Sequence, residues 1–163
     1  MENSTITLYM KGYLAQFLAG YFDCAGESSI KIRKDSFIGQ LLYDLLELVP
    51  EDCIFRPSDR TDNKKPLKIE IGILGAYPQK NSRYHYYLPK SKQFLIEKQV
   101  RFVFDELLCL YLKDVSEETE GEIKSLIEKF CDKYGIDFAV YYDTLKKKYF
   151  RAKTKKKLHS YVP

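Results

Sequence analysis

Residues 123–149 read IKSLIEKFCDKYGIDFAVYYDTLKKKY, and this stretch gives the clearest structural signal in the chain. Its first half repeats apolar residues at intervals of three and four, which places them on one face of a helix: Ile123, Leu126, Ile127, Phe130, Cys131 and Tyr134. Gly135 stands where a left-handed residue ends many helices, and Asp137 can accept a backbone N–H at the start of another. The stretch therefore predicts two helices joined by a turn of about three residues.

The second of these helices combines an apolar face with a cationic one. The apolar face is predicted to consist of Phe138, Tyr141, Tyr142, Leu145 and Tyr149. Eight basic residues follow on its other faces and in the tail: Lys146, Lys147, Lys148, Arg151, Lys153, Lys155, Lys156 and Lys157. We expect the apolar face to dock on the protein and these eight residues to bind the phosphates of nucleic acid, DNA in the first place.

The charge of the chain is concentrated at this end. The 163 residues carry a formal net charge of +4, yet residues 146–163 hold the eight basic residues and no acid. The preceding 145 residues contain 19 basic and 23 acidic residues, so they are formally −4. Attraction to a polyanion is therefore expected in one place only.

The sequence before this pair alternates strand-like and helix-like patterns. Residues 6–9 and 30–33 predict strands, and each precedes a predicted helix, at 11–22 and at 36–49 before Pro50. The polar residues 56–66 predict a mobile loop, 67–73 and 83–88 a β-hairpin, and 91–112 a long helix. The fold class is α+β: two strand–helix units, a β-hairpin and three consecutive C-terminal helices. We divide it into an α+β core at 1–114 and a helical hairpin with a basic tail at 115–163, or into one continuous domain.

The segment around Gly135 resembles a helix-turn-helix. In that pattern Phe130 and Tyr134 are buried in the first helix, Cys131 is the small residue at the crossing, Gly135 is the turn glycine, and Ile136 and Tyr141 are apolar. The last buried position falls on Thr144, with Leu145 one residue later, and a plain helical hairpin is the alternative. Because Asp137 and Asp143 stand where the resembled motif reads bases, the resemblance favours binding to phosphates over base recognition.

The whole layout resembles small accessory proteins of prophages and integrative elements, which implies a DNA-binding role in the cytoplasm. No signal peptide pattern or apolar run of about 20 residues is present, so we expect no membrane association. The alternative function is a protein-interaction module, a homodimer or adaptor, in which the apolar surplus of residues 91–112 is the contact.

Catalytic motifs are missing from the sequence. Its two histidines, His85 and His159, have no metal-ligand spacing, its four cysteines form no CxxC pair, and phosphate-binding glycine loops are absent. We therefore expect no enzyme, no cofactor and no metal. Tyr84 and Tyr86 lie in a strand with basic neighbours, where they can stack on unpaired bases or pack across strands.

Overall fold

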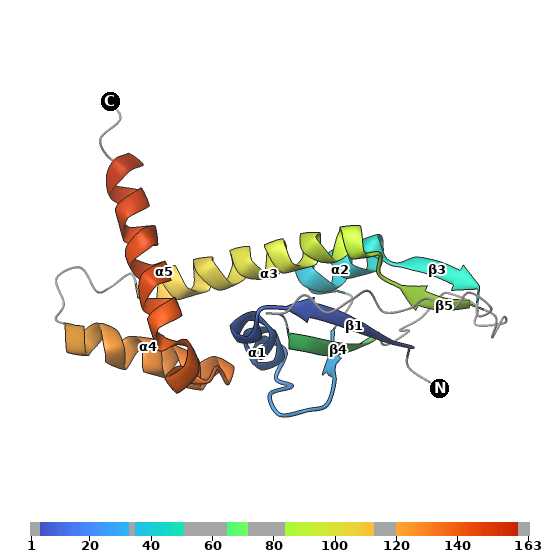
Figure 1. Ribbon diagram of the computed structural model, residues 1–163, viewed down its shortest axis with the longest axis horizontal. Helices are drawn as coiled ribbons and strands as arrows, with labels where there is room; N and C mark the ends of the chain where they lie inside the picture. The colour runs from blue at the N-terminus through green and yellow to red at the C-terminus, as the bar shows by residue number, and fades with distance from the viewer. Residues whose placement is uncertain (1–3, 33–34, 51–64, 72–83, 113–119, 160–163) are drawn as a thin grey trace.

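The computed structural model describes residues 4–32, 35–50, 65–71, 84–112 and 120–159. Within these ranges the order of elements is β1 (Ser4–Met10), α1 (Gly12–Tyr21), β2 (Ile30–Lys31), α2 (Phe37–Leu45), β3 (Glu47–Pro50), β4 (Lys65–Ile71), β5 (Tyr84–Tyr87), α3 (Lys90–Tyr111), α4 (Glu120–Tyr134) and α5 (Phe138–His159). The predicted α+β class is confirmed, with three consecutive helices at its C-terminal end (Figure 1).

Strand β4 lies at the centre of a three-stranded sheet in the order β1-β4-β2. It runs antiparallel to β1, where Ile6 is opposite Ile69, and parallel to β2, where Ile30 is opposite Ile69. Ile6, Ile30 and Ile69 are all buried, as is Leu8 on the same face of β1. Alternate residues of these strands thus give the sheet one apolar face.

The predicted hairpin between residues 67–73 and 83–88 is wrong. Strand β4 pairs with β1 and β2, and β5 instead pairs antiparallel with β3, with Val49 opposite His85. The pairing of β4 with β1 buries the apolar alternation of both strands against the helices. The alternation of apolar residues along a strand indicates which face is buried, but it does not identify the neighbouring strand in the sheet.

Helix α2 ends earlier than predicted. Ser36 caps it, since its hydroxyl accepts the Gly39 N–H at 3.0 Å, but Leu46 already has an extended backbone and residues 47–50 form β3. Pro50 disfavours the helical conformation of the residue before it, and that residue is β-branched Val49. Phe37, the first residue of α2, is apolar but 61% exposed.

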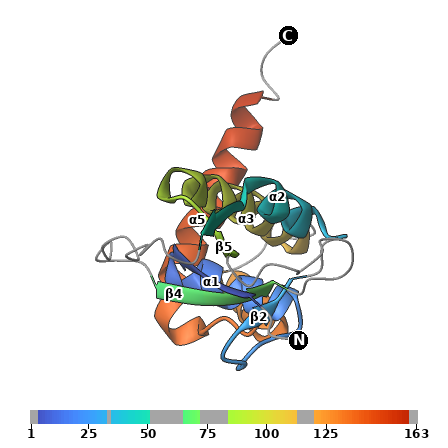
Figure 2. The ribbon, with the colours of Figure 1, turned by 90° about the vertical axis from the view of Figure 1, so that its right-hand side faces the viewer.

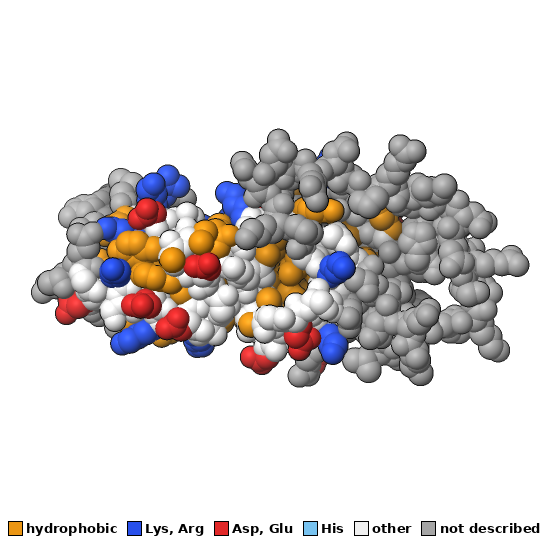
Figure 3. All heavy atoms as spheres, turned by 60° about the horizontal axis from the view of Figure 1, so that its bottom comes forward, with side chains coloured by type: hydrophobic (Ala, Val, Ile, Leu, Met, Phe, Trp, Pro, Cys, Tyr) orange, Lys and Arg blue, Asp and Glu red, His pale blue; other side chains and the backbone are white. Residues whose placement is uncertain are grey.

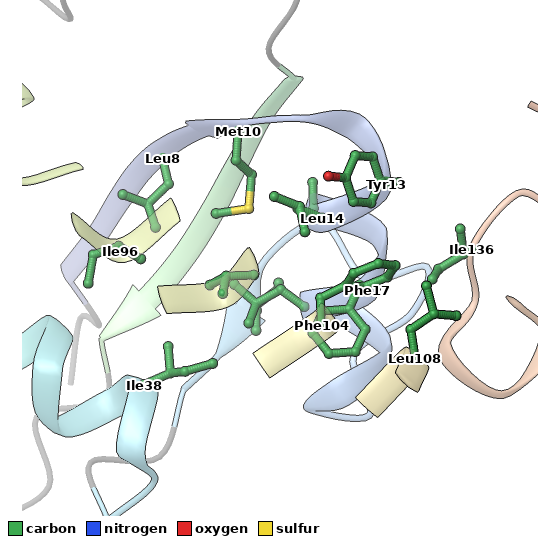
Figure 4. Close-up of a cluster of buried hydrophobic side chains, with 14 of the residues drawn as sticks. Leu8, Met10, Tyr13, Leu14, Phe17, Ile38, Ile96, Phe104, Leu108 and Ile136 are labelled. Carbon is green, nitrogen blue, oxygen red and sulfur yellow. The ribbon is translucent and has the colours of Figure 1, made fainter. Parts of the chain in front are cut away.

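Helices α1, α3, α4 and α5 share one core. Phe17 of α1 makes an edge contact with Phe104 of α3 at 5.1 Å between ring centroids, and Phe104 contacts Phe130 of α4 at 5.6 Å. Figure 4 shows Phe17 and Phe104 side by side within this cluster. Buried side chains from both sides of residue 114 therefore belong to the same core.

Helix α3 connects the two ends of an elongated molecule. Strands β3 and β5 lie at its N-terminal end, and α4 and α5 lie at its C-terminal end (Figure 1). Helix α5 rises beyond the other elements in both ribbon views (Figures 1 and 2). None of the helices in the described part of the chain is both long and apolar enough to cross a membrane.

Candidate nucleic-acid interface

The turn between α4 and α5 has the geometry that its sequence predicts. Gly135 adopts a left-handed φ of 62°. The N–H of Ile136 donates to the carbonyl of Cys131 at 2.9 Å, and the N–H of Gly135 donates to that of Asp132 at 3.4 Å. This pair of bonds satisfies carbonyls at the end of α4.

The start of α5 is fixed by its cap and by α1. The Asp137 carboxylate accepts the Val140 N–H at 3.2 Å, as an N-cap residue does. The Asp137 N–H donates to the side-chain carbonyl of Gln16 at 3.0 Å. Helix α5 therefore begins at a defined point on α1.

The predicted docking face of α5 is confirmed. Leu145 and Tyr149 are buried, while Phe138, Tyr141 and Tyr142 are half-buried and pack against the core. Because this face is docked, each basic residue between these positions projects from a defined side of α5, and that side differs from one residue to the next.

Lys148 is held within the protein. Its ammonium nitrogen is 2.7 Å from a carboxylate oxygen of Asp105, and only 20% of the side chain is exposed. The same nitrogen lies 5.6 Å from the ring centroid of Tyr13 and 5.7 Å from that of Phe104. These contacts stabilise the packing of α5 on α3, so Lys148 has less freedom to meet an external phosphate than the sequence suggests.

Lys146 takes a different direction, because its ammonium group lies over the Tyr142 ring at 5.8 Å. Lys147 and Arg151 are one helical turn apart, and both are exposed. Neither forms an ion pair with any residue that the structure describes. Lys147 and Arg151 are thus the described cations of α5 that are available to bind an anion.

Lys147 and Arg151 line a groove of about 930 Å³ between α1, α3 and α5. We call it the cationic groove. It is defined by the residues at the N-terminus of α1 and by charged residues of α3 and α5: Lys11, Gly12, Tyr13, Arg101, Asp105, Glu106, Lys147, Lys148 and Arg151. Five cationic side chains stand against two acidic ones, an excess of three positive charges.

The start of α1 adds positive potential to the groove. Its first N–H groups have no acceptor within the helix, and Lys11, the N-cap residue, supplies no side-chain acceptor. A helix N-terminus favours a negatively charged group. Lys11, like Lys147 and Arg151, makes no ion pair with a described residue.

Two further donors border the groove. Arg101 binds the buried Glu97 carboxylate at 3.0 Å, while its Nε is buried and has no hydrogen-bond partner in the described part of the protein. Burial raises the pKa of Tyr13 to about 12, so its hydroxyl stays protonated at neutral pH. The groove is therefore bordered by a neutral hydroxyl donor and by a guanidinium that already binds Glu97.

The face of the molecule in Figure 3 shows no comparable gathering of cations. Lys and Arg side chains of the described residues are interspersed there with Asp and Glu. In the cationic groove, by contrast, basic side chains outnumber acidic ones on a concave surface.

Several predicted residues lie outside the described side chains. The backbone of α5 is helical through His159, but the side chains of Lys153, Lys155, Lys156 and Lys157 are not among those described. The same holds for Tyr84 and Tyr86, whose strand β5 lies at the opposite end of the molecule from α5 (Figure 1). The two predicted nucleic-acid surfaces are not adjacent.

Lys11 and Arg101 were not among the residues predicted from the sequence. Each is an isolated basic residue beside an apolar helix pattern, 90 positions from the other. Only the packing of α1 on α3 brings them to the same groove as Lys147 and Arg151.

No family model, curated protein or solved structure matches this chain. Among the described residues, no group of three or more His, Cys, Asp or Glu side chains is placed to hold a metal ion. The case for a function therefore depends on the cationic groove and on α5.

Proposed function

We propose that the protein binds nucleic acid, with DNA as the first candidate, as a non-catalytic accessory or regulatory protein. The observation that carries this proposal is the convergence of Lys11, Lys147 and Arg151 on one groove, with no ion pair to any described residue. Unpaired cations that face a common space bind phosphates and release counterions.

Phosphates are favoured over bases as the main contact. The available cations stand in the middle of α5, whereas the start of this helix presents Asp137 and Asp143. In a helix-turn-helix the start of the second helix contacts base edges. Two acidic side chains at this position repel the phosphate backbone of the nucleic acid. The capped turn after α4 suits both a helix-turn-helix and a plain helical hairpin, and binding through phosphates applies to either.

The outer part of α5 extends this surface. The helix comprises 22 residues, or about 33 Å at 1.5 Å per residue. Lys153, Lys155, Lys156 and Lys157 follow Arg151 in this direction. We propose that they contact phosphates further along the same backbone, with the groove as the fixed end of the site.

The test is fluorescence anisotropy with labelled duplex DNA, single-stranded DNA and RNA, repeated over a range of salt concentrations. Lys147→Ala with Arg151→Ala removes two phosphate contacts, so the slope of log K against log salt falls by about 1.8. The same relation gives a loss of affinity of about 60-fold near 0.1 M salt.

Lys124→Ala with Lys129→Ala is the matched control. Both lysines are exposed on α4 and outside the groove, and the double substitution removes the same net charge. We expect little change in its slope. Equal losses in both double variants, or no binding of any nucleic acid at low salt, contradict the proposal.

A further inference from the structure

Helix α3 carries a ridge of exposed residues at steps of four. Phe94, Phe102 and Leu110 are 59%, 60% and 58% exposed. Lys98 and Glu106 stand between them and are also exposed. Positions four apart form one of the ridges by which helices pack on each other, and we call these five residues the α3 ridge.

The α3 ridge lies outside the hydrophobic core, and Glu106 of the ridge also lines the cationic groove. Val100, Phe104 and Leu108 on the other side of α3 make the core contacts. Lys98 and Glu106 form no ion pair with a described residue. Each step of four turns about 40° around the helix, so Lys98, Phe102 and Glu106 share one side of α3. A large apolar side chain exposed between charged ones, such as Phe102, is a candidate centre for an interaction site.

The α3 ridge reads apolar, positive, apolar, negative, apolar, and this order is complementary to itself. If a second copy runs antiparallel with Phe102 against Phe102, Lys98 of each copy faces Glu106 of the other. Phe94 and Leu110 are about 160° apart around the helix axis, so they lie outside this central contact. A parallel arrangement in the same register would place like charges together.

We propose that the protein forms a symmetric dimer in which the α3 ridge packs against the α3 ridge of a second copy, with the two-fold axis at Phe102. Packing of such ridges along each other gives a crossing angle of about −50°, the commonest class in globular proteins. A two-fold interface requires one surface to be self-complementary. Lys98 and Glu106, on either side of Phe102, meet that requirement. Binding to an unrelated partner would not require self-complementary charges, so their order favours a second copy of this chain.

The interface consists of a single helix pair, so the dimer is weak and depends on concentration. Sedimentation velocity without nucleic acid, between about 5 and about 500 µM protein, covers the range of such weak contacts. We expect the sedimentation coefficient to rise with concentration toward that of a dimer. Because no nucleic acid is present, this result is separate from the outcome of the binding test above.

Charge exchange then tests the register. Lys98→Glu places acids opposite each other at two points of the interface, and Glu106→Lys does the same with bases. Each single variant should weaken dimerisation by about tenfold, and the double variant should restore it. Phe102→Asp should abolish it, whereas Lys124→Glu, an exposed position on α4, should leave it unchanged.

Circular dichroism establishes that each variant folds, which the exposure of all four positions leads us to expect. A monomer at every concentration overturns the proposal. So does a dimer that Phe102→Asp leaves intact, or a double charge variant as weak as the single ones.

Discussion

Gly20 of α1 packs directly against the backbone of Tyr134 at the end of α4, and Gly20→Ala tests this contact. A Cβ at Gly20 would lie 2.1 Å from the carbonyl oxygen of Tyr134 and 2.5 Å from its carbonyl carbon. Because both atoms belong to the backbone, no side-chain rotation can relieve the clash. The two helices must separate by about 1 Å before the contact becomes tolerable.

The separation weakens the contacts that α4 makes with the core. The ring of Tyr134 lies 5.1 Å from that of Phe17, and Phe130 contacts Phe104. Overpacking of this kind costs about 3 kcal/mol, and the higher helix propensity of alanine returns about 1 kcal/mol. The net loss of about 2 kcal/mol corresponds to a fall in Tm of roughly 4–8 °C for a domain of this size.

Thermal unfolding followed by circular dichroism measures this loss, and Gly121→Ala is the control. A Cβ at Gly121 meets nothing within 4 Å, and the residue lies in the first turn of α4. We expect Gly121→Ala to keep or raise the stability by up to about 1 kcal/mol. If Gly20→Ala melts at the same temperature as the unsubstituted protein, the packing of α4 on α1 described above is wrong.

Two further predictions concern the cationic groove. Burial raises the pKa of Tyr13 from 10.0 to about 12, so the neutral hydroxyl stabilises the folded state fully below pH 10, and this stabilisation is lost as the pH rises toward 12. In unfolding measured as a function of pH, Tyr13→Phe should reduce the loss of stability between pH 10 and 12. An identical loss in the variant contradicts the raised pKa of Tyr13. Asp105→Asn removes an acid from the groove and the partner of Lys148, so anisotropy should show about 8-fold tighter nucleic-acid binding near 0.1 M salt, with a stability loss of up to about 1 kcal/mol. Weaker binding by this variant would mean that Asp105 acts by positioning Lys148.

The helices were predictable because their information is local. The spacing of Ile123, Ile127 and Phe130 identifies α4, and Gly135 and Asp137 identify the turn after it, through backbone hydrogen bonds within a few residues. The same holds for α1 and α3. Each of these features depends on residues within one or two turns of the chain.

The strand pairings were not predictable in this way. Ile69 is buried between Ile6 and Ile30, which are 63 and 39 positions away. A strand pattern is equally compatible with a neighbour nearby and with one far along the chain. The apolar spacing continues past Leu45 as far as Pro50, so the pattern predicts a longer helix where the structure has β3.

The candidate site shows the same division. The sequence placed Lys147 and Arg151 on the outer side of a docked helix, because Leu145 and Tyr149 define its buried face. It gave no sign that Lys11 faces the same groove, since the packing of α1 on α3 decides that. Nor did it show that Asp105 holds Lys148.

The buried face of α5 has a consequence for the basic residues beside it. Leu145 and Tyr149 fix the rotation of the helix about its axis, and this rotation brings Lys148 to Asp105. Lys147 and Arg151 are four positions apart and therefore share one side of the helix, which this rotation directs into the groove. The docked face of α5 thus orients Lys147 and Arg151, so binding needs less ordering of α5 than a free basic tail would require.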